Sequence, residues 1–282
     1  MSGLIAESDR LEFTILGSGS SGGVPRADGH WGACDPADPR NRRSRCSMMA
    51  RRLSGEGPDL HTTVVIDASP EFRLQTAAAG ARRLDGLLMT HDHADQAHGI
   101  DDIRAFAIAQ RARIDVWMDG PTRRSLERRF GYIFAGEGLY PAIANIHDVP
   151  GHGTRWQVEG PSGPIPVTTF DQDHGGVRSV GYRIGGMAYS SDVVRLPDSA
   201  FAALEGLDVW IVDALRYTPH PTHAHVDRAL EWIARVRPKR AILTNLHIDL
   251  DFTELASRLP PGVEPAYDGM RFELSLSAEN HG

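Results

Sequence analysis

The chain has 282 residues, of which 41% are hydrophobic and 24% are charged, and its formal net charge is −7. This length allows one large domain or two small ones, and the composition is ordinary for a globular protein with a substantial core. No apolar run reaches the roughly 18 to 20 residues of a membrane helix, and Met1–Arg10 lacks the pattern of a signal peptide. Cys34 and Cys46 provide no disulfide framework. We therefore expect a cytoplasmic protein without membrane association, and the acidic charge disfavours long nucleic acid as a partner.

Alternating and apolar runs predict strands that interleave with helices from one end of the chain to the other. We expect strands at 11–16, 62–67, 84–89, 114–118, 167–170, 179–184, 187–190, 207–212, 240–244 and 271–276, and helices at 70–79, 99–110, from 121 onward and at 226–236. Residues 27–46 are expected to form an extended surface loop. No repeat or linker interrupts this order. It favours a single domain, 1–282, with an α+β fold in which two mixed sheets are covered by outer helices.

A glycine-rich segment follows the first predicted strand. Gly17, Gly19 and Gly22 satisfy the pattern GxGxxG, but Pro25 and a long loop follow where a dinucleotide-binding site requires a helix. We therefore reject nucleotide-cofactor binding at this segment. The glycines are better explained by a turn near the site in which backbone segments approach closely.

Six arginines fall within thirteen residues after this segment: Arg40, Arg42, Arg43, Arg45, Arg51 and Arg52. Such a run of charge is usually a solvated loop and strand edge. The alternative is a clamp for a phosphate-bearing substrate, because guanidinium groups match phosphate oxygens in pairs. The sequence leaves both interpretations open.

The most informative segment is Leu87–Gly99, where an apolar strand runs into three histidines and two aspartates within eight residues. Crowded imidazole and carboxylate groups add no stability to a fold, but they are ligands that suit zinc, manganese or iron. His91 and His93 are two residues apart, so in extended backbone their side chains leave the same face. Asp95 can return from the following turn. The segment therefore predicts a metal site.

Further polar residues follow other predicted strands. They are Asp67, His174, Asp192, Asp213, Asn245 and His247. Each alone would be unremarkable, but residues from many strand ends that converge on one edge are how a sheet scaffold builds a site.

With these residues the sequence resembles the metallo-β-lactamase superfamily, and within it the PhnP-like phosphoribosyl cyclic phosphodiesterases, which are related to tRNA 3′-processing nucleases. The matching segments span nearly the whole chain in the family's order. They are Gly17–Pro25, Val65–Asp67, Thr90–Asp95, Gly99–Arg104, Tyr189–Asp192, Pro221–His223 and Tyr267–Met270. The resemblance implies an αββα sandwich with a metal cleft at one edge of the sheets.

The resemblance also implies roles for individual residues. His91, His93 and His174 match the ligands of a first metal, and Asp192 matches the carboxylate that bridges to a second metal. Asp95 matches a ligand of that second metal. In the same way, Asp67 matches a residue that orients the ligand loop, and His223 matches the histidine that protonates the leaving oxygen.

The chain departs from the family's pattern at the second metal. The last histidine of the signature is Gln96, and Asn245 stands where a final histidine ligand usually follows its strand. His247 could substitute, since two residues further along an extended chain restore the same face. His98 could also reach the cleft as a substrate or supporting residue. An accessory zinc of some relatives needs a cysteine cluster, whereas this loop offers only Cys34, so we expect that zinc to be absent.

These expectations together predict a metal-dependent phosphodiesterase that uses one or two divalent ions, zinc or manganese, with iron as a further option. His223 and Asp95 are the predicted catalytic groups, while Arg104 or the early arginines would neutralise phosphoryl charge. The predicted substrate is a small cyclic phosphate of a ribose or a nucleotide. Two alternatives stay open: a tRNA-processing nuclease, and a phosphosugar- or nucleotide-binding protein with a degenerate second metal site. A homodimer is one option for the assembly.

Overall fold

The computed structural model describes residues 10–276, so the predicted lack of a signal peptide at Met1–Arg10 lies almost wholly outside the described residues. One group of strands consists of β1 (Arg10–Gly17), β2 (Ser47–Arg52), β3 (Thr62–Ile66), β4 (Gly86–Leu88), β5 (Ile114–Met118), β6 (Ala144–Asp148) and β14 (Arg271–Ser275). A second group consists of β7 (Arg155–Val158), β8 (Ile165–Asp173), β9 (Arg178–Ile184), β10 (Met187–Ser190), β11 (Val209–Asp213), β12 (Arg240–Thr244) and β13 (Val263–Pro265).

Each group forms one seven-stranded mixed sheet. The first has the order β14-β1-β2-β3-β4-β5-β6, antiparallel from β14 to β3 and parallel from β3 to β6. The second has the order β13-β12-β11-β10-β9-β8-β7, parallel from β13 to β10 and antiparallel from β10 to β7. The central parallel strands are buried on both faces, which explains their continuous apolar runs.

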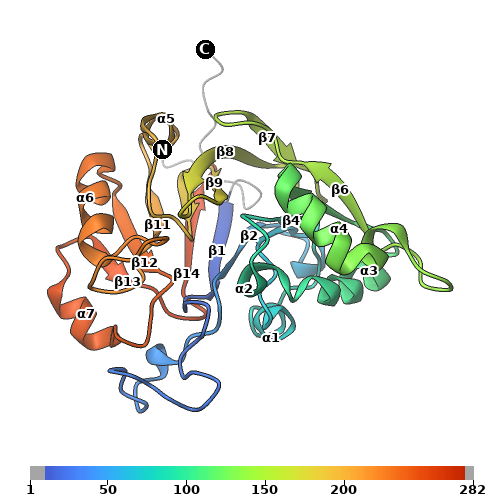
Figure 1. The fold of residues 1–282 in the computed structure, drawn as a ribbon. Coiled ribbons are helices and arrows are strands. Elements are labelled where there is room, and N and C mark those ends of the chain that lie inside the picture. Colours follow the sequence, from blue (N-terminus) through green and yellow to red (C-terminus); the bar gives the residue numbers. More distant parts are fainter. Residues whose placement is uncertain (1–9, 277–282) are drawn as a thin grey trace.

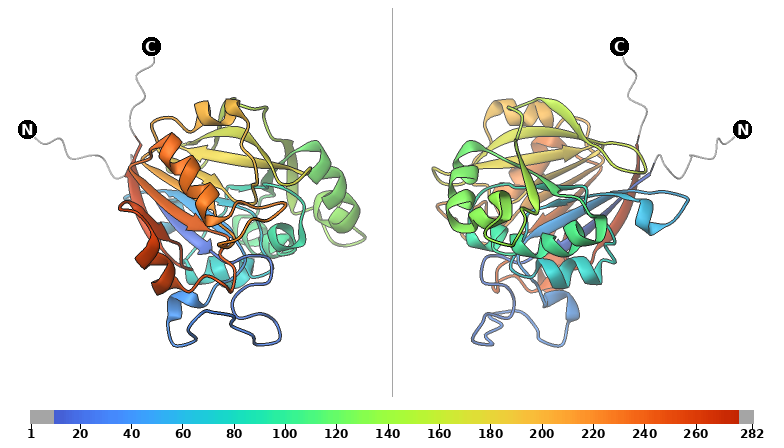
Figure 2. Two further views of the ribbon diagram at one scale, coloured as in Figure 1. Left: turned by 60° about the vertical axis from the view of Figure 1, so that its left-hand side comes forward. Right: turned by 90° about the vertical axis from the view of Figure 1, so that its right-hand side faces the viewer.

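The helices are α1 (Phe72–Ala78), α2 (Ala94–Ala97), α3 (Arg104–Gln110), α4 (Gly120–Ala135), α5 (Asp198–Ala203), α6 (Val226–Val236) and α7 (Phe252–Arg258). Helices α1 to α4 pack on the outer face of the first sheet and α5 to α7 on the outer face of the second (Figures 1 and 2). A third apolar cluster lies between the sheets and joins Phe13 of β1 with Tyr182 of β9. These layers confirm the predicted αββα sandwich.

Local sequence explains where the helices begin and which faces they bury. The carboxylate of Asp119 accepts a hydrogen bond from the Thr122 amide, 2.9 Å away, at the start of α4, and Asp251 caps α7 in the same way. In α6 the buried side chains Val226, Ala229 and Trp232 recur every three residues, which is the spacing of one helical face.

Several details differ from the predictions. The helix expected at 99–110 is divided into a 3-10 helix, Ile100–Ile103, and α3. Strands β2, β6, β7 and β13 and helices α2, α5 and α7 have no predicted counterpart. The segment 27–46 is a loop, drawn in blue below the sheets in Figure 1, but it is not on the surface throughout, because Cys34, Asn41 and Arg43 are buried.

The glycine-rich segment packs tightly at the edge of the first sheet, as expected of a close backbone approach. Gly19 bridges to Arg45 and to Leu246, which follows β12 of the other sheet. A Cβ atom on Gly19 would lie 2.9 Å from the Cβ of Arg43, so a larger residue would collide there. The segment thus connects the two sheets at this edge.

Candidate metal centre

Two overlapping groups of possible metal ligands lie at one edge of the sandwich. The first group is His91, His93 and His174, and the second is His174, Asp192 and His223. Within each group, the ligand atoms all lie within 4.8 Å of one another. Residues from the ends of β4, β8 and β10 therefore meet, with His223 from the loop before α6.

The backbone at this edge adopts an unusual conformation at three polar residues. Asp67, Asp192 and Asn245 follow β3, β10 and β12, and all three have positive φ angles of 62°, 53° and 62°. Non-glycine residues rarely occupy this left-handed region, and such positions cluster at functional sites. The turns here aim side chains into the site rather than simply end the strands.

Asp67 orients His91 through Thr90. The carboxylate of Asp67 accepts hydrogen bonds from the backbone amide and the hydroxyl of Thr90, both at 2.8 Å. That hydroxyl donates its single proton to Asp67, so toward His91 it can act only as an acceptor. The Nδ1 atom of His91, 2.9 Å away, therefore carries the proton of this hydrogen bond. The Nε2 lone pair of His91 is then free for a metal, as in most histidine metal sites.

The state of His91 fits a metal ligand. Its Nε2 atom is buried and has no hydrogen-bond partner among the described residues. Burial and the neighbouring histidines His93 and His174 hold the pKa of His91 well below its usual range, so the ring is neutral. A neutral imidazole with an unpaired, buried nitrogen is a group that a bound metal would satisfy.

The tautomer of His174 is also fixed by a hydrogen bond at Nδ1. Its Nδ1 atom lies 2.7 Å from the backbone carbonyl of Thr222, which can only accept, so Nδ1 carries the proton and Nε2 is free. That Nε2 atom is 4.0 Å from Oδ1 of Asp192. The rings of His91, His93 and His174 have centroids 4.5 to 5.1 Å apart. The donor set therefore fits a first transition metal.

His223 lies between two buried carboxylates. Its Nδ1 atom is 2.9 Å from Oδ2 of Asp213 and 3.9 Å from Oδ1 of Asp192. Burial lowers the pKa of His223, but the charge and hydrogen bond of Asp213 and the charges of Asp192 and Asp95 outweigh it and raise the pKa to about 9. Without a metal, the ring is therefore protonated at neutral pH.

Gln96, Asn245 and Asp95 complete this edge of the site. The amide nitrogen Nε2 of Gln96 donates to Oδ2 of Asp192 at 3.0 Å and approaches Oδ2 of Asp95 at 3.5 Å. The side-chain nitrogen of Asn245 lies 3.1 Å from Nδ1 of His223. Burial and the charge of Asp192 raise the pKa of Asp95. The amide of Gln96 thus contacts the two carboxylates that the resemblance assigns to the second metal, whereas Asn245 lies against His223, the residue that it assigns as proton donor.

Three further residues from the sequence analysis lie outside both ligand groups. Nδ1 of His247 faces Oδ2 of Asp249 at 2.9 Å. The Nε2 atom of His98 is 3.1 Å from a guanidinium nitrogen of Arg129, and Arg104 forms an ion pair of 2.8 Å with Asp101. The structure therefore does not bring these three to the ligand atoms.

Two supporting residues could not be assigned a role from the sequence. The sequence marks Asp213 only as a polar residue after a strand, whereas in the structure it is the closest partner of His223. Arg129 of α4 donates to the backbone carbonyl of Asp92 at 2.5 Å and so fastens the loop between His91 and His93. No local motif marks either residue.

The run of six arginines is not solvated throughout, because two of its members are buried. Arg43 is 2% exposed, and its guanidinium donates to Asn41 and to the backbone carbonyl of His247. Arg51 is buried and paired with Glu12 across β1 and β2. The solvated interpretation is wrong for these two, because both guanidinium groups are buried and donate hydrogen bonds within the fold.

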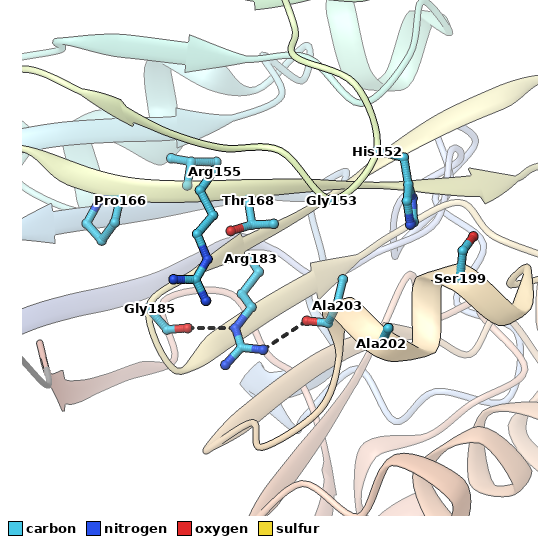
Figure 3. A pocket seen from close by; sticks show the side chains of 11 residues that line it. His152, Gly153, Arg155, Pro166, Thr168, Arg183, Gly185, Ser199, Ala202 and Ala203 are labelled. Atoms are coloured by element: carbon cyan, nitrogen blue, oxygen red, sulfur yellow. Dashed lines mark hydrogen bonds between the residues drawn. The ribbon is translucent and has the colours of Figure 1, made fainter. Parts of the chain in front are cut away.

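One cavity of about 290 Å³ lies away from these groups, between β7, β8 and α5. Figure 3 shows Arg155, Arg183, His152 and Ser199 along its wall. The guanidinium of Arg183 donates to the carbonyls of Gly185 and Ala203, so it ties the end of α5 to the sheet. No ligand group of the metal centre lines this cavity.

Comparison with known proteins agrees with this geometry. A model described as a beta-lactamase superfamily domain matches residues 62–248. The chain belongs to the metallo-β-lactamase superfamily. A solved structure described as a new diphosphatase from the PhnP family is 31% identical, with a TM-score of 0.80 over 95% of this chain and 98% of that one. The predicted superfamily and PhnP-like branch are confirmed, and the protein is a metal-dependent hydrolase.

Two solved structures share the fold at lower identity. Zn²⁺-bound PqqB from Methylobacterium extorquens is 18% identical, with a TM-score of 0.71 over 93% of this chain and all of that one. The short form of human tRNase Z is 16% identical, with a TM-score of 0.63 over 93% of this chain and 98% of that one. A curated relative, an octanoyltransferase of Porphyromonas gingivalis, is 29% identical over 92% of this chain, which spans 51% of that relative.

In the described part of this chain, no helix is both long and apolar enough to cross a membrane.

Proposed function

We propose that this metallo-β-lactamase-fold hydrolase cleaves the phosphodiester of a small phosphorylated molecule, with a cyclic phosphate of a ribose or a nucleotide as the leading substrate. The observation that carries the proposal is the overlap of the two ligand groups, which brings His223 within 4.8 Å of metal-ligand atoms. A metal-ligand set beside a protonated imidazole is what hydrolysis with a poor leaving group requires. The acidic composition supports a small substrate rather than long nucleic acid, and a cytoplasmic location belongs to the same proposal.

His91, His93, His174 and Asp192 are the residues that would hold the metal. Zinc, manganese or iron bound there supplies a Lewis acid that lowers the pKa of water and polarises a phosphoryl oxygen. Asp67 keeps His91 in the tautomer that offers Nε2, and the Thr222 carbonyl does the same for His174. These contacts fix the ligands before a substrate arrives.

His223 is the proposed general acid. Its Nδ1–H is held by Asp213, so the proton that it gives up is the one on Nε2. With a pKa of about 9, the metal-free ring carries that proton at neutral pH. We propose that it protonates the leaving alkoxide, while the carboxylate of Asp95 orients the attacking water as a hydrogen-bond acceptor.

Hydrolysis of a diphosphate is a second candidate, because the 31% identical relative is described as a diphosphatase. The two reactions make different demands on His223. An alkoxide is a poor leaving group and needs a proton, whereas a leaving phosphate is already a stable anion and needs little help. The dependence of the rate on the leaving group therefore separates the two candidates.

The decisive experiment is steady-state hydrolysis by the metal-loaded protein of three substrates: a 2′,3′-cyclic nucleotide, bis(p-nitrophenyl) phosphate and a nucleoside diphosphate. We expect turnover of the first two. Turnover of the diphosphate alone would favour the second candidate, and binding without turnover at full metal content would favour a binding protein. Cleavage of tRNA, with affinity that falls steeply as salt rises, would instead identify a nuclease.

A further inference from the structure

We propose that this chain holds one metal ion, and that the side-chain amide of Gln96 takes the place of a second metal by hydrogen bonding to Asp192 and Asp95. The proposal rests on the proposed use of the site as a metal centre, and it concerns how many ions that centre holds. It differs from a routine two-metal arrangement in which Asp192 would bridge the ions.

The contacts of Gln96 place a donor where a second cation would be needed. Gln96 is 0% exposed, and its Nε2 atom lies 3.0 Å from Asp192 and 3.5 Å from Asp95. Two carboxylates that approach each other in a buried site repel unless positive charge or hydrogen-bond donors lie between them. An amide N–H group supplies such donors without being able to ligate a metal through that nitrogen.

The orientation of the amide also opposes a second ion. The other end of the side chain, Oε1, is buried without a hydrogen-bond partner among the described residues. Turning the amide would offer this oxygen to a metal, but without a metal it would set the oxygen against two carboxylates. The hydrogen bond to Asp192 therefore favours the orientation in which the amide nitrogen, rather than the oxygen, faces the second metal position.

Asn245 is also buried, and its side chain lies against His223. It is 1% exposed, has a positive φ of 62°, and directs its side-chain nitrogen to within 3.1 Å of Nδ1 of His223. The residue that could have replaced a histidine ligand, His247, faces Asp249 instead. The second position is thus left with the carboxylates of Asp95 and Asp192 and one nearby imidazole, His223, whose Nδ1 is held by Asp213, and this set does not fit a second metal.

The first position needs nothing from Gln96. His91, His93 and His174 form one ligand group in which His91 and His174 each present a free Nε2 atom, and Asp192 adjoins this group through His174, 4.0 Å away. Four nitrogen and oxygen donors match the tetrahedral preference of zinc, and a manganese ion held by them would add water ligands. Gln96 is therefore a positioning residue that holds Asp192 toward this ion.

The test is the metal content of the full-length protein after loading with Mn²⁺ and removal of excess ion. We expect one manganese per chain by elemental analysis and the paramagnetic resonance spectrum of isolated Mn²⁺. In the double variant Gln96→His/Asn245→His we expect two ions per chain and a spectrum of coupled Mn²⁺ pairs. Gln157→His, which adds a histidine on exposed β7, is the matched control and should retain one ion.

Two ions per chain with a coupled spectrum in the unaltered protein would overturn the inference, whether or not the double variant folds. A double variant that is folded by circular dichroism and still binds one ion would also overturn it. These results are separate from the proposed function. One bound ion without turnover of any substrate would contradict the proposed function but support the inference of a single metal. Two bound ions with turnover would contradict the inference but support the proposed function.

Discussion

Oδ2 of Asp213 lies 2.9 Å from Nδ1 of His223 and also accepts a hydrogen bond from the backbone amide of Val193 at 3.0 Å. The backbone contact fixes the carboxylate, which is fully buried, and the carboxylate in turn fixes the imidazole. Val193 directly follows Asp192, so the same turn that aims Asp192 into the site anchors the partner of His223. The position and the charge of the proposed acid are therefore coupled to the metal-ligand loop.

Replacing Asp213 with Asn should lower the rate and shift its pH dependence. The carboxylate raises the pKa of His223, so its loss should lower that pKa and move the alkaline limb of the kcat profile to lower pH. We expect kcat at pH 8 to fall by about 100-fold, the lower end of the usual contribution of acid catalysis. The measurement is kcat against pH, with Asp208→Asn, which alters a carboxylate paired with Lys239, as the control. An unchanged alkaline limb would contradict this role for Asp213.

His223→Asn should affect substrates according to their leaving groups. For a cyclic nucleotide, whose leaving group is an alkoxide, kcat should fall by about 100-fold or more. For bis(p-nitrophenyl) phosphate, whose leaving group is stable without a proton, the fall should be about tenfold or less. His30→Asn, at an exposed loop histidine, should change neither rate. Equal losses on both substrates would mean that His223 acts as a metal ligand rather than as the acid.

Thr90→Val should weaken metal binding although Thr90 touches no metal. The substitution keeps the shape of the side chain but removes the hydroxyl that connects Asp67 to His91. Loss of such a supporting contact usually costs 10- to 100-fold in affinity, so we expect a Kd about 10- to 100-fold higher. Competition with a chelator measures it, and Thr154→Val on the surface is the control. An unaltered Kd in the folded variant would show that Asp67 does not act through Thr90.

The metal ligands that could be predicted from the sequence are those that lie close together in one segment of the chain. His91, His93 and Asp95 follow one strand, so their chemistry and spacing are visible in a single segment. The contact between Gln96 and Asp192 joins residues 96 positions apart, and only the folded turn at Asp192 creates it. The sequence could show that Gln96 is not a histidine, but not what its amide contacts.

The fold was predictable where strands are buried and apolar, and less so at charged or short elements. Strand β2 contains Arg51 and Arg52, which read as surface residues, yet Arg51 pairs with Glu12 directly opposite on β1. Strand β13 has three residues and ends in Pro265, so it carries no alternation to detect. Burial of Arg43 depends on two acceptors: Asn41, two residues before it, and the backbone carbonyl of His247, which lies 204 positions away.

The metal-free protein should lose stability in alkaline solution because of His223. Its pKa is raised from 6.5 to about 9, so the folded state binds the proton more tightly than the unfolded state. The contribution is fully present below about pH 6.5 and is lost as pH rises through about 9. A shift of this size corresponds to about 3 kcal/mol.

The measurement is the free energy of unfolding in urea between pH 6 and pH 10, with metal removed by a chelator. His223→Asn removes the titrating group, so the difference between the unaltered protein and this variant isolates its contribution from other groups. We expect that difference to shrink by about 2 to 3 kcal/mol across this range. A constant difference would mean that Asp213 and Asp192 do not hold the proton on His223. Asp213→Asn should reduce the pH dependence, because the carboxylate that raises the pKa most is then uncharged.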